Sequence, residues 1–271
     1  MMTLKILLAV ILSGTIGAVA GYLGSLMLTK RMALMGGALG HLTLPGIALA
    51  LLYDFDVSIG AFFFLGFGVL LIWFLERQTQ LHLEALTAVV FSTSLAVAFL
   101  FLPQEETEIA LLGDVSQITL STVLVTLAIA GGIFLIVKRI YPNMVLIGIS
   151  LDLAQSQQID PRRYNIIYLI CIALTVALGV RIVGGLMTAA LLAIPACTAK
   201  NISKNLTQYA YFSFSVGALA AVLGIAGYAA TDLPPGPLII IASGLLFLVS
   251  VYLKIRQKGH EGKTQPSTES Q

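Results

Sequence analysis

The strongest constraint on this chain is a series of long apolar stretches that are separated only by short polar segments. A helix needs about 20 predominantly apolar residues to cross the hydrocarbon core of a bilayer. Nine stretches come close to this length, at residues 4–28, 38–53, 58–75, 84–102, 118–137, 165–180, 182–199, 208–230 and 236–253. The sequence therefore predicts a polytopic membrane protein with about nine spans.

Composition and the spacing of the apolar residues decide the fold class. The chain is 58% apolar and 10% charged, whereas soluble domains are roughly half apolar and about one quarter charged. The apolar residues do not alternate with polar ones, as the strands of a membrane barrel would require. Since only helices and closed barrels satisfy the backbone in lipid, we predict an all-α transmembrane helical bundle over residues 1–256. The polar tail 257–271 is expected to be disordered.

The loops between the stretches alternate in charge. Lys and Arg concentrate in short cytoplasmic loops of membrane proteins, and here they mark every second loop and the tail. These residues are Lys30, Arg31, Arg77, Lys138, Arg139, Arg162, Arg163, Lys200, Lys204, Lys254, Arg256, Lys258 and Lys263. The pattern predicts an external N-terminus and a cytoplasmic C-terminus. Lys5 fits this orientation less well, and it leaves open a variant with eight spans or an internal N-terminus.

Two apolar segments, 35–53 and 181–201, each contain a Gly pair that is followed about ten residues later by a Pro. Glycine permits close helix approach and proline removes an amide donor, so both helices should be kinked or interrupted. They cross in opposite directions, one in each half of the chain, as in an inverted repeat. Paired interruptions of this kind indicate a translocation path. The alternative is that both are only sites of close helix packing.

The central polar segment 139–163 is long for a cytoplasmic loop. Its sequence ISLDLAQSQQIDP favours a short amphipathic helix that starts at a cap, Ser150 or Asp152, and ends before Pro161. We expect Ile149, Leu153 and Ala154 to share one side of this helix. Such a helix could receive a partner protein, or the segment could simply anchor the membrane interface.

Five motifs together resemble the zinc and manganese permeases of the ABC importer class, the ABC-3 type. They are HLTLPGIALA at 41–50, LLGDVS at 111–116, LDLA at 151–154, VGGLMTAALLAIPACTAK at 183–200 and DLPPGPLIIIASGLLFL from Asp232. The chain is more distantly similar to ferric siderophore and cobalamin permeases. The resemblance implies a multi-pass protein of the bacterial inner membrane. It also implies a second permease copy, two ATP-binding subunits and an extracytoplasmic metal-binding protein as partners.

The resemblance also implies roles for particular residues. Segment 139–163 would couple to the ATPase, through Ser150, Leu151, Asp152, Leu153 and Ala154. The acidic residues of an external loop would face the metal-binding protein or gather cations at the mouth. These residues are Glu105, Glu106, Glu108 and Asp114.

The translocation path would include residues of both interrupted segments, namely His41, Pro45, Gly184 and Pro195. An imidazole within a span is costly unless it faces a cavity or a partner, so His41 is either a structural residue or a weak contact for the metal. The family often has Asp and Ser where this chain has Gly37 and Gly40. Because Gly37 offers no carboxylate, a paired metal site at this position is weakened.

We find neither a nucleotide-binding motif nor a set of catalytic residues in the sequence. GHEGKT at 259–264 superficially resembles a phosphate loop, but no strand precedes it. We therefore expect a permease that is not an enzyme and binds no cofactor, with ATP hydrolysed by a separate subunit. Its surroundings would be membrane lipid, with no nucleic acid. The transported metal stays open among zinc, manganese and iron.

Three alternatives remain. The chain could be an ABC permease for a metal chelate, an ion-coupled secondary transporter or a membrane-embedded enzyme. A secondary transporter usually needs an intramembrane Asp or Glu, and the only candidate is Glu84 at a helix start. An enzyme would need a convergent set of catalytic residues, which the sequence does not show.

Overall fold

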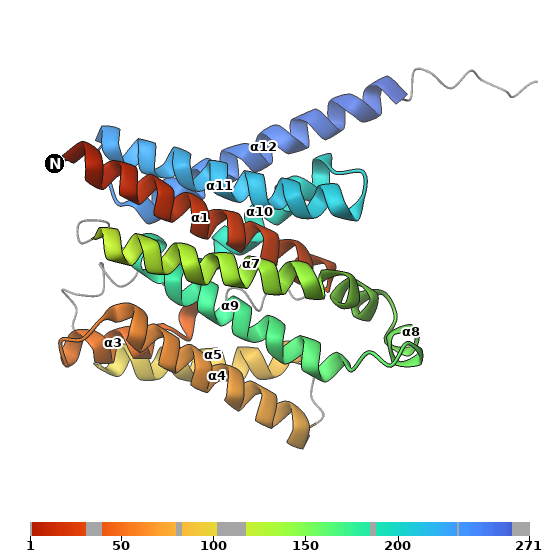
Figure 1. The fold of residues 1–271 in the computed structure, drawn as a ribbon, viewed down its shortest axis with the longest axis horizontal. Coiled ribbons are helices and arrows are strands. Elements are labelled where there is room, and N and C mark those ends of the chain that lie inside the picture. The colour runs from red at the N-terminus through yellow and green to blue at the C-terminus, as the bar shows by residue number, and fades with distance from the viewer. Residues whose placement is uncertain are drawn as a thin grey trace, which may run out of the picture.

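The computed structural model describes residues 2–30, 40–79, 83–101, 118–184, 188–231 and 233–261. Over these residues the regular structure is entirely helical, which confirms the all-α prediction (Figure 1). The helices are α1 (Met2–Thr29), α3 (Leu44–Leu52), α4 (Val57–Thr79), α5 (Leu83–Phe101), α7 (Leu120–Ile149), α8 (Leu151–Ser156), α9 (Pro161–Val183), α10 (Thr188–Ile202), α11 (Leu206–Thr231) and α12 (Pro235–Glu261).

The nine predicted stretches correspond to α1, α3, α4, α5, α7, α9, α10, α11 and α12. Six of the described helices, α1, α4, α7, α9, α11 and α12, are long and apolar enough to cross a membrane. The shorter ones include α3, with nine residues, and α10, with 15. Both belong to the segments in which the sequence predicts interruptions. The structure is thus a polytopic helical bundle.

Two predicted boundaries are wrong. Residues 139–149 are not loop, because α7 continues as a helix to Ile149 and contains Pro142 in its interior. Pro142 is exposed, and it removes one hydrogen-bond donor from the helix. The predicted tail also starts too early, because α12 extends to Glu261.

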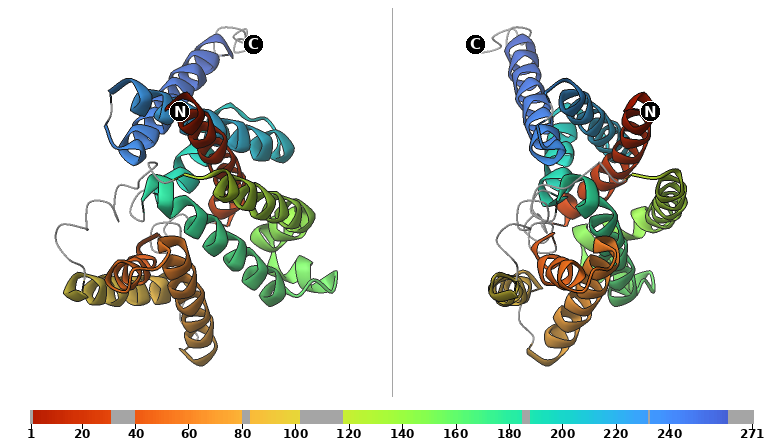
Figure 2. Two further views of the ribbon diagram at one scale, coloured as in Figure 1. Left: turned by 60° about the vertical axis from the view of Figure 1, so that its left-hand side comes forward. Right: turned by 90° about the vertical axis from the view of Figure 1, so that its left-hand side faces the viewer.

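The helices fall into two groups that meet along one junction (Figures 1 and 2). In the core group, α1 is central and packs against α7, α9, α10 and α11, while α12 packs on α10 and α11. In the side group, α3 packs against α4 and α5. The side group joins the core group where α4 packs against α9.

Close backbone contacts hold the interior of each group together. A Cβ atom on Gly21 of α1 would overlap the carbonyl oxygen of Ser213 of α11, and one on Gly24 would overlap that of Leu192 of α10. In the side group, a Cβ atom on Gly46 of α3 would overlap the carbonyl oxygen of Gly60 of α4. Small residues at such crossings allow helices in a membrane to pack backbone against backbone.

One end of the bundle carries basic residues next to α8 (Figure 1). Arg77 lies in the last turn of α4, Lys200 in the last turn of α10 and Arg162 in the first turn of α9. Asp54 and Asp56 precede α4 and lie at the opposite end of that helix. This arrangement agrees with the predicted orientation, in which α8 and the C-terminus are cytoplasmic.

Candidate functional site

The first interrupted segment breaks its helix directly after His41. Gly40 and His41 are helical, two turn residues follow, and α3 starts at Leu44. The hydroxyl group of Thr43 donates to the carbonyl oxygen of Gly40 over 2.6 Å, which closes the turn. Pro45 lies in the first turn of α3. The N–H groups of this turn have no partner within the helix, so a proline costs no hydrogen bond there. The predicted interruption is therefore confirmed, and Pro45 restarts the helix.

His41 combines an aromatic contact with an unpaired nitrogen. Its ring lies against Phe91 of α5, with 4.8 Å between the ring centroids and 38° between the ring planes. The Nδ1 atom is buried and has no hydrogen-bond partner within the described part of the chain. A buried polar atom without a partner costs about 1–3 kcal/mol. Within the described residues, therefore, no hydrogen bond of the kind that a purely structural histidine requires reaches this nitrogen.

An imidazole nitrogen is a common ligand for transition metals. Over the residues that the structure describes, no three or more His, Cys, Asp or Glu side chains are close enough to hold a metal ion together. His41 can therefore supply a single contact rather than a complete site. Gly37, four residues earlier, lies outside the described residues.

The second interrupted segment breaks between α9 and α10. Gly184 has φ 82° and ψ 158°, and its N–H donates to the carbonyl oxygen of Val180 over 2.8 Å. This backbone region is essentially restricted to glycine. The hydroxyl group of Thr188, at the start of α10, donates to the carbonyl oxygen of Gly184 over 2.7 Å. Pro195 is buried inside α10.

The structure places the two interrupted segments in different groups. His41 and Pro45 belong to the side group, whereas Gly184 and Pro195 belong to the core group, where α10 packs against α1, α11 and α12. α3 runs toward the end where α4 begins, and α10 runs toward the opposite end, where α11 begins (Figure 1). The predicted opposite directions are confirmed. The role of the four residues in a translocation path stays a prediction.

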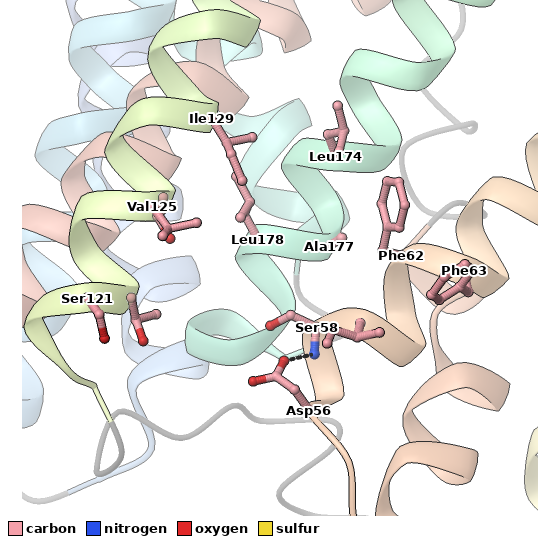
Figure 3. Close-up of a pocket in the computed structure, with 13 residues that line it drawn as sticks. Asp56, Ser58, Phe62, Phe63, Ser121, Val125, Ile129, Leu174, Ala177 and Leu178 are labelled. Atoms are coloured by element: carbon pink, nitrogen blue, oxygen red, sulfur yellow. Dashed lines mark hydrogen bonds between the residues drawn. The ribbon is translucent and has the colours of Figure 1, made fainter.

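A cavity of about 670 Å³ lies at the junction of the two groups (Figure 3). Its walls come from α4, α7 and α9, and they are mostly apolar, as Phe62, Val125 and Leu174 illustrate. Its polar side chains include Asp56, Ser58 and Ser121, which lie at the end opposite α8. Asp56 caps α4, since its Oδ1 accepts a hydrogen bond from the N–H of Ser58 over 2.8 Å. None of the predicted path residues lines this cavity, and no feature of the sequence predicted it.

The predicted coupling helix is α8. Ser150 caps it, because the Ser150 hydroxyl oxygen accepts a hydrogen bond from the N–H of Leu153 over 3.3 Å. Asp152 lies in the first turn, where a negative charge is favourable. The next helix starts at Pro161 with Asp160 as its cap. The predicted short helix is therefore confirmed, and of the two expected caps, Ser150 and Asp152, Ser150 is the one that the structure uses.

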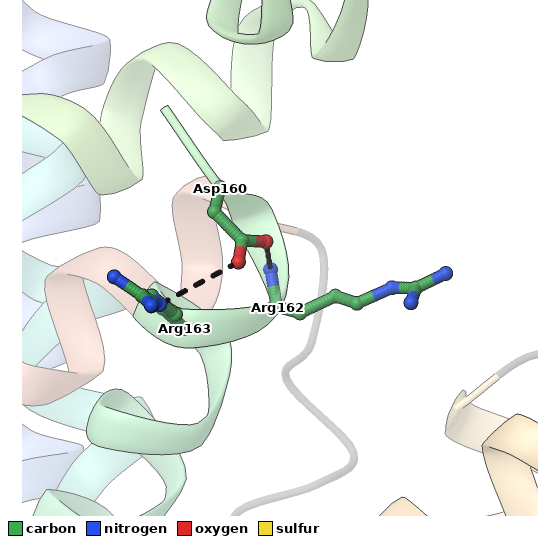
Figure 4. Close-up of polar contacts among 3 residues, drawn as sticks. All are labelled: Asp160, Arg162 and Arg163. Carbon is green, nitrogen blue, oxygen red and sulfur yellow. Dashed lines mark hydrogen bonds and ion pairs between the residues drawn. The ribbon is translucent and has the colours of Figure 1, made fainter. Parts of the chain in front are cut away.

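The turn into α9 is organised by Asp160 (Figure 4). Its carboxylate accepts a hydrogen bond from the N–H of Arg162 over 3.0 Å and lies 3.8 Å from the Nε atom of Arg163. The Arg163 side chain is 84% exposed, and surface ion pairs of this kind contribute about 0–1 kcal/mol. Asn143 of α7 donates to the hydroxyl oxygen of Tyr164 over 2.7 Å. The last contact joins α7 to α9, the two helices that α8 connects in the sequence.

The prediction of which residues share one side of this helix is partly wrong. Ala154 is fully buried, whereas Ile149, Leu151 and Leu153 are 69%, 54% and 49% exposed. Ala154 therefore packs inward and does not share a face with Ile149 and Leu153. A helix of six residues is too short for its periodicity to indicate which side faces the bundle. The exposed apolar residues of this segment are the ones available to a partner protein.

The acidic residues predicted to face the metal-binding protein are not described by the structure. Glu105, Glu106, Glu108 and Asp114 lie in 102–117, outside the described residues. Their suggested role stays a prediction.

Comparison with known proteins identifies the family. Residues 2–254 match the ABC 3 transport family. The manganese import system permease protein ScaB of Streptococcus parasanguinis is 26% identical over 255 residues, which are 92% of this chain and 91% of that protein. The high-affinity zinc uptake system membrane protein ZnuB of Buchnera aphidicola is 27% identical, over 88% of this chain and 93% of that protein.

The fold is also that of a solved permease. The structure of PsaBC from Streptococcus pneumoniae in complex with Fab superposes with a TM-score of 0.78 at 24% identity, covering 89% of each chain. Because the family match extends over nearly the whole sequence, this chain belongs to the ABC 3 transport family.

Proposed function

We propose that this chain is the membrane-spanning permease subunit of an ATP-binding-cassette importer that carries a divalent transition metal into the cytoplasm. The match to the ABC 3 transport family over residues 2–254 carries this proposal. Relatives that cover about nine tenths of the chain are named for manganese and zinc transport. The metal of this chain is one of zinc, manganese and iron.

The partners follow from this assignment. A second copy of the chain completes the membrane unit, two ATP-binding subunits supply the energy, and an extracytoplasmic metal-binding protein delivers the ion. The permease itself neither hydrolyses ATP nor needs a bound cofactor. The exposed apolar side chains of Ile149, Leu151 and Leu153 support docking of an ATP-binding subunit at the basic end of the bundle.

His41 supports a weak contact for the metal along the path. One imidazole nitrogen that has no hydrogen-bond partner among the described residues can bind a passing ion, but a single ligand does not hold the ion tightly. Weak binding suits an importer, because a complete ligand set would slow release.

Uptake into proteoliposomes tests the function. The permease is reconstituted with its ATP-binding subunit and metal-binding protein, and uptake of zinc, manganese and iron is measured separately. We expect uptake of at least one metal that requires ATP and both partners. Uptake that is driven by a proton or sodium gradient without ATP would instead identify a secondary transporter.

Docking is tested by placing charges on the exposed side of α8. The double variant Leu151→Asp, Leu153→Asp should insert and fold normally, because both side chains face away from the bundle. Loss of two central apolar contacts typically costs about 2 kcal/mol or more, which is roughly a thirtyfold loss of affinity. The measurement is the amount of ATP-binding subunit that co-purifies with the permease.

Gln155→Asp is the matched control, because Gln155 is exposed on the same helix and is polar. Equal retention of the ATP-binding subunit by all three proteins would show that docking occurs elsewhere. A charge at Ala154 would be uninformative, because that residue is buried and the change would disturb packing.

A further inference from the structure

Two cavities follow one another along α1, between α7 and α11. One has a volume of about 560 Å³ and the other about 420 Å³, and residues of the same three helices line both. α1 packs against α7 and against α11, and it lies between them (Figure 1). α1 is therefore the floor of a groove, here called the α1 groove, and α7 and α11 are its walls.

The two parts of the α1 groove differ in chemistry. The larger cavity is lined almost entirely by apolar side chains and glycines, such as Val10, Leu127 and Gly131. The smaller cavity is lined by Tyr22, Lys138, Tyr141, Pro142, Val145, Leu206, Thr207, Ala210 and Tyr211. The two parts meet at a cluster of aromatic rings: the ring of Tyr22 contacts that of Phe134, which lines the larger cavity, at 5.0 Å between centroids, and the ring of Phe134 contacts that of Phe214 of α11 at 5.4 Å. The groove therefore has an apolar part and a polar part in sequence.

The polar part is positive. Lys138 is exposed, and none of the described residues that line this cavity is acidic. α11 begins at Leu206 beside it, and the N–H groups of Leu206 and Thr207 are among those that precede the first intrahelical bonds. The N-terminus of a helix carries a partial positive charge that favours anions. The lysine and the helix end thus act on the same small volume.

The dimensions match one leaflet of a bilayer. Val10 and Tyr22 are separated by about 18 Å along α1, at 1.5 Å per residue. Half of the hydrocarbon core measures about 15 Å. The polar part lies toward the end of the bundle at which the basic residues gather. A molecule with its anionic group there would extend its apolar part toward the middle of the membrane.

We propose that the α1 groove binds one anionic phospholipid of the cytoplasmic leaflet. Its phosphate group lies near Lys138 and the N-terminus of α11, and an acyl chain lies in the apolar part of the groove. Basic pockets between transmembrane helices on the cytoplasmic side recognise anionic headgroups in the same way. The lipid would bridge α7 and α11 over α1, so it would stabilise the core group without contacting the proposed metal path.

Two positions separate the headgroup from the acyl chain. Lys138 lines the polar part, and its neighbour Arg139 is also exposed but does not line it. Gly131 lines the apolar part, while Gly132 does not. A Cβ atom on either glycine would meet no atom within 4 Å. Gly131→Leu should therefore fill the groove without a clash, and Gly132→Leu adds the same side chain outside it.

Native mass spectrometry tests the proposal on the full-length permease. The protein is purified in mild detergent with equal amounts of phosphatidylglycerol and phosphatidylcholine, and the lipid that stays bound is identified. We expect one phosphatidylglycerol molecule to be retained preferentially. Lys138→Gln should reduce this preference about fivefold, which corresponds to about 1 kcal/mol for one lysine near an anionic headgroup. Arg139→Gln should leave the preference unchanged.

The glycine variants test the acyl part. Gly131→Leu should abolish retention of the bound lipid, while Gly132→Leu retains it. Excess inorganic phosphate should not displace a lipid that is held at both ends. Equal retention of both lipids by the unmodified protein, or equal effects of the Lys138 and Arg139 changes, would overturn the proposal. These readouts measure bound lipid, so they are independent of metal uptake.

Discussion

The two interrupted segments have the same Gly and Pro signature, but the structure uses them differently. Around Gly184 the break is satisfied by hydrogen bonds from the N–H of Gly184 and the hydroxyl of Thr188, and α10 is packed among α1, α11 and α12. Around His41 the turn is also closed, yet a buried ring nitrogen has no partner in the described residues. Among the described residues, the break at Gly184 is closed by hydrogen bonds, whereas the turn at His41 leaves a ring nitrogen without one.

The same Gly and Pro pattern therefore has two different structural roles in this chain. Gly and Pro in apolar helices can mark close packing or a path for a substrate. In the core group, Gly24 lets α1 approach the backbone of α10 near Leu192, three residues before Pro195. That contact favours packing for the second segment. In the side group, the unsatisfied nitrogen of His41 favours a path. The predictions below are ordered by their expected effect on stability, and each can contradict this division.

The largest effect is expected for Gly24→Ala in the core group. The new Cβ atom would overlap the carbonyl oxygen of Leu192, which belongs to a backbone and cannot rotate away. Overpacking of this kind costs typically 1–3 kcal/mol, so we expect about 3 kcal/mol of destabilisation. Thermal unfolding of the purified protein in detergent measures the change.

Gly66→Ala is the matched control for this variant. Gly66 lies in α4, and a Cβ atom there would meet nothing within 4 Å. Because Ala favours a helix over Gly by about 1 kcal/mol, the control should be as stable as the unmodified protein or more so. Similar stability of the two variants would show that α1 and α10 are not held by this contact.

A smaller loss is expected for Gly184→Ala. The φ of 82° and ψ of 158° are sparsely accessible to residues with a side chain, and holding one there costs about 1–3 kcal/mol. We expect about 2 kcal/mol of destabilisation and normal uptake for each molecule that folds. Gly244→Ala in α12, where a Cβ atom meets open space, is the control. Normal stability with lost uptake would make the second segment a moving part of the path.

The sequence predicted most of the fold because lipid leaves few choices. Each apolar stretch had to become a helix, and each of the nine predicted stretches did. Local chemistry also offered Ser150, with Asp152, as the cap of the short helix α8, which ends before Pro161 as predicted. The end of α7 was misjudged, because Lys138, Arg139 and Pro142 together suggested that the helix ends at the membrane surface.

The candidate site was harder to predict, because its properties depend on neighbours from other helices. Helical periodicity suggested that Ala154 would face a partner, but contacts with the bundle bury it. Among the described residues His41 Nδ1 has no hydrogen-bond partner, and the ring that packs against His41, that of Phe91, comes from another helix, α5. The cavity at the junction requires α4, α7 and α9 to be placed together. None of these relations can be derived from spacing within one helix.

The smallest effect on stability, and the clearest effect on function, is expected for His41→Phe. Phenylalanine keeps a flat ring against Phe91 and removes the buried nitrogen that lacks a partner. An unsatisfied polar atom is lost, so stability should be unchanged or should rise by up to about 1 kcal/mol. Uptake should fall about tenfold, which corresponds to about 1.4 kcal/mol for one lost metal contact. Thermal unfolding and metal uptake are measured on the same preparation.

His41→Asn supplies the counterpart, because its amide oxygen can still approach a metal ion although the ring is lost. If the nitrogen acts on the path, the Asn variant should be less stable than the Phe variant and yet transport faster. A structural histidine predicts that the Phe variant is the less stable of the two, since it leaves a hydrogen-bond partner unpaired, and that uptake follows stability, so the Asn variant is both more stable and faster. The order of the two variants in stability and in uptake therefore decides between the readings. Opposite orders support the path, and the same order in both measurements would assign His41, like Gly184, to packing.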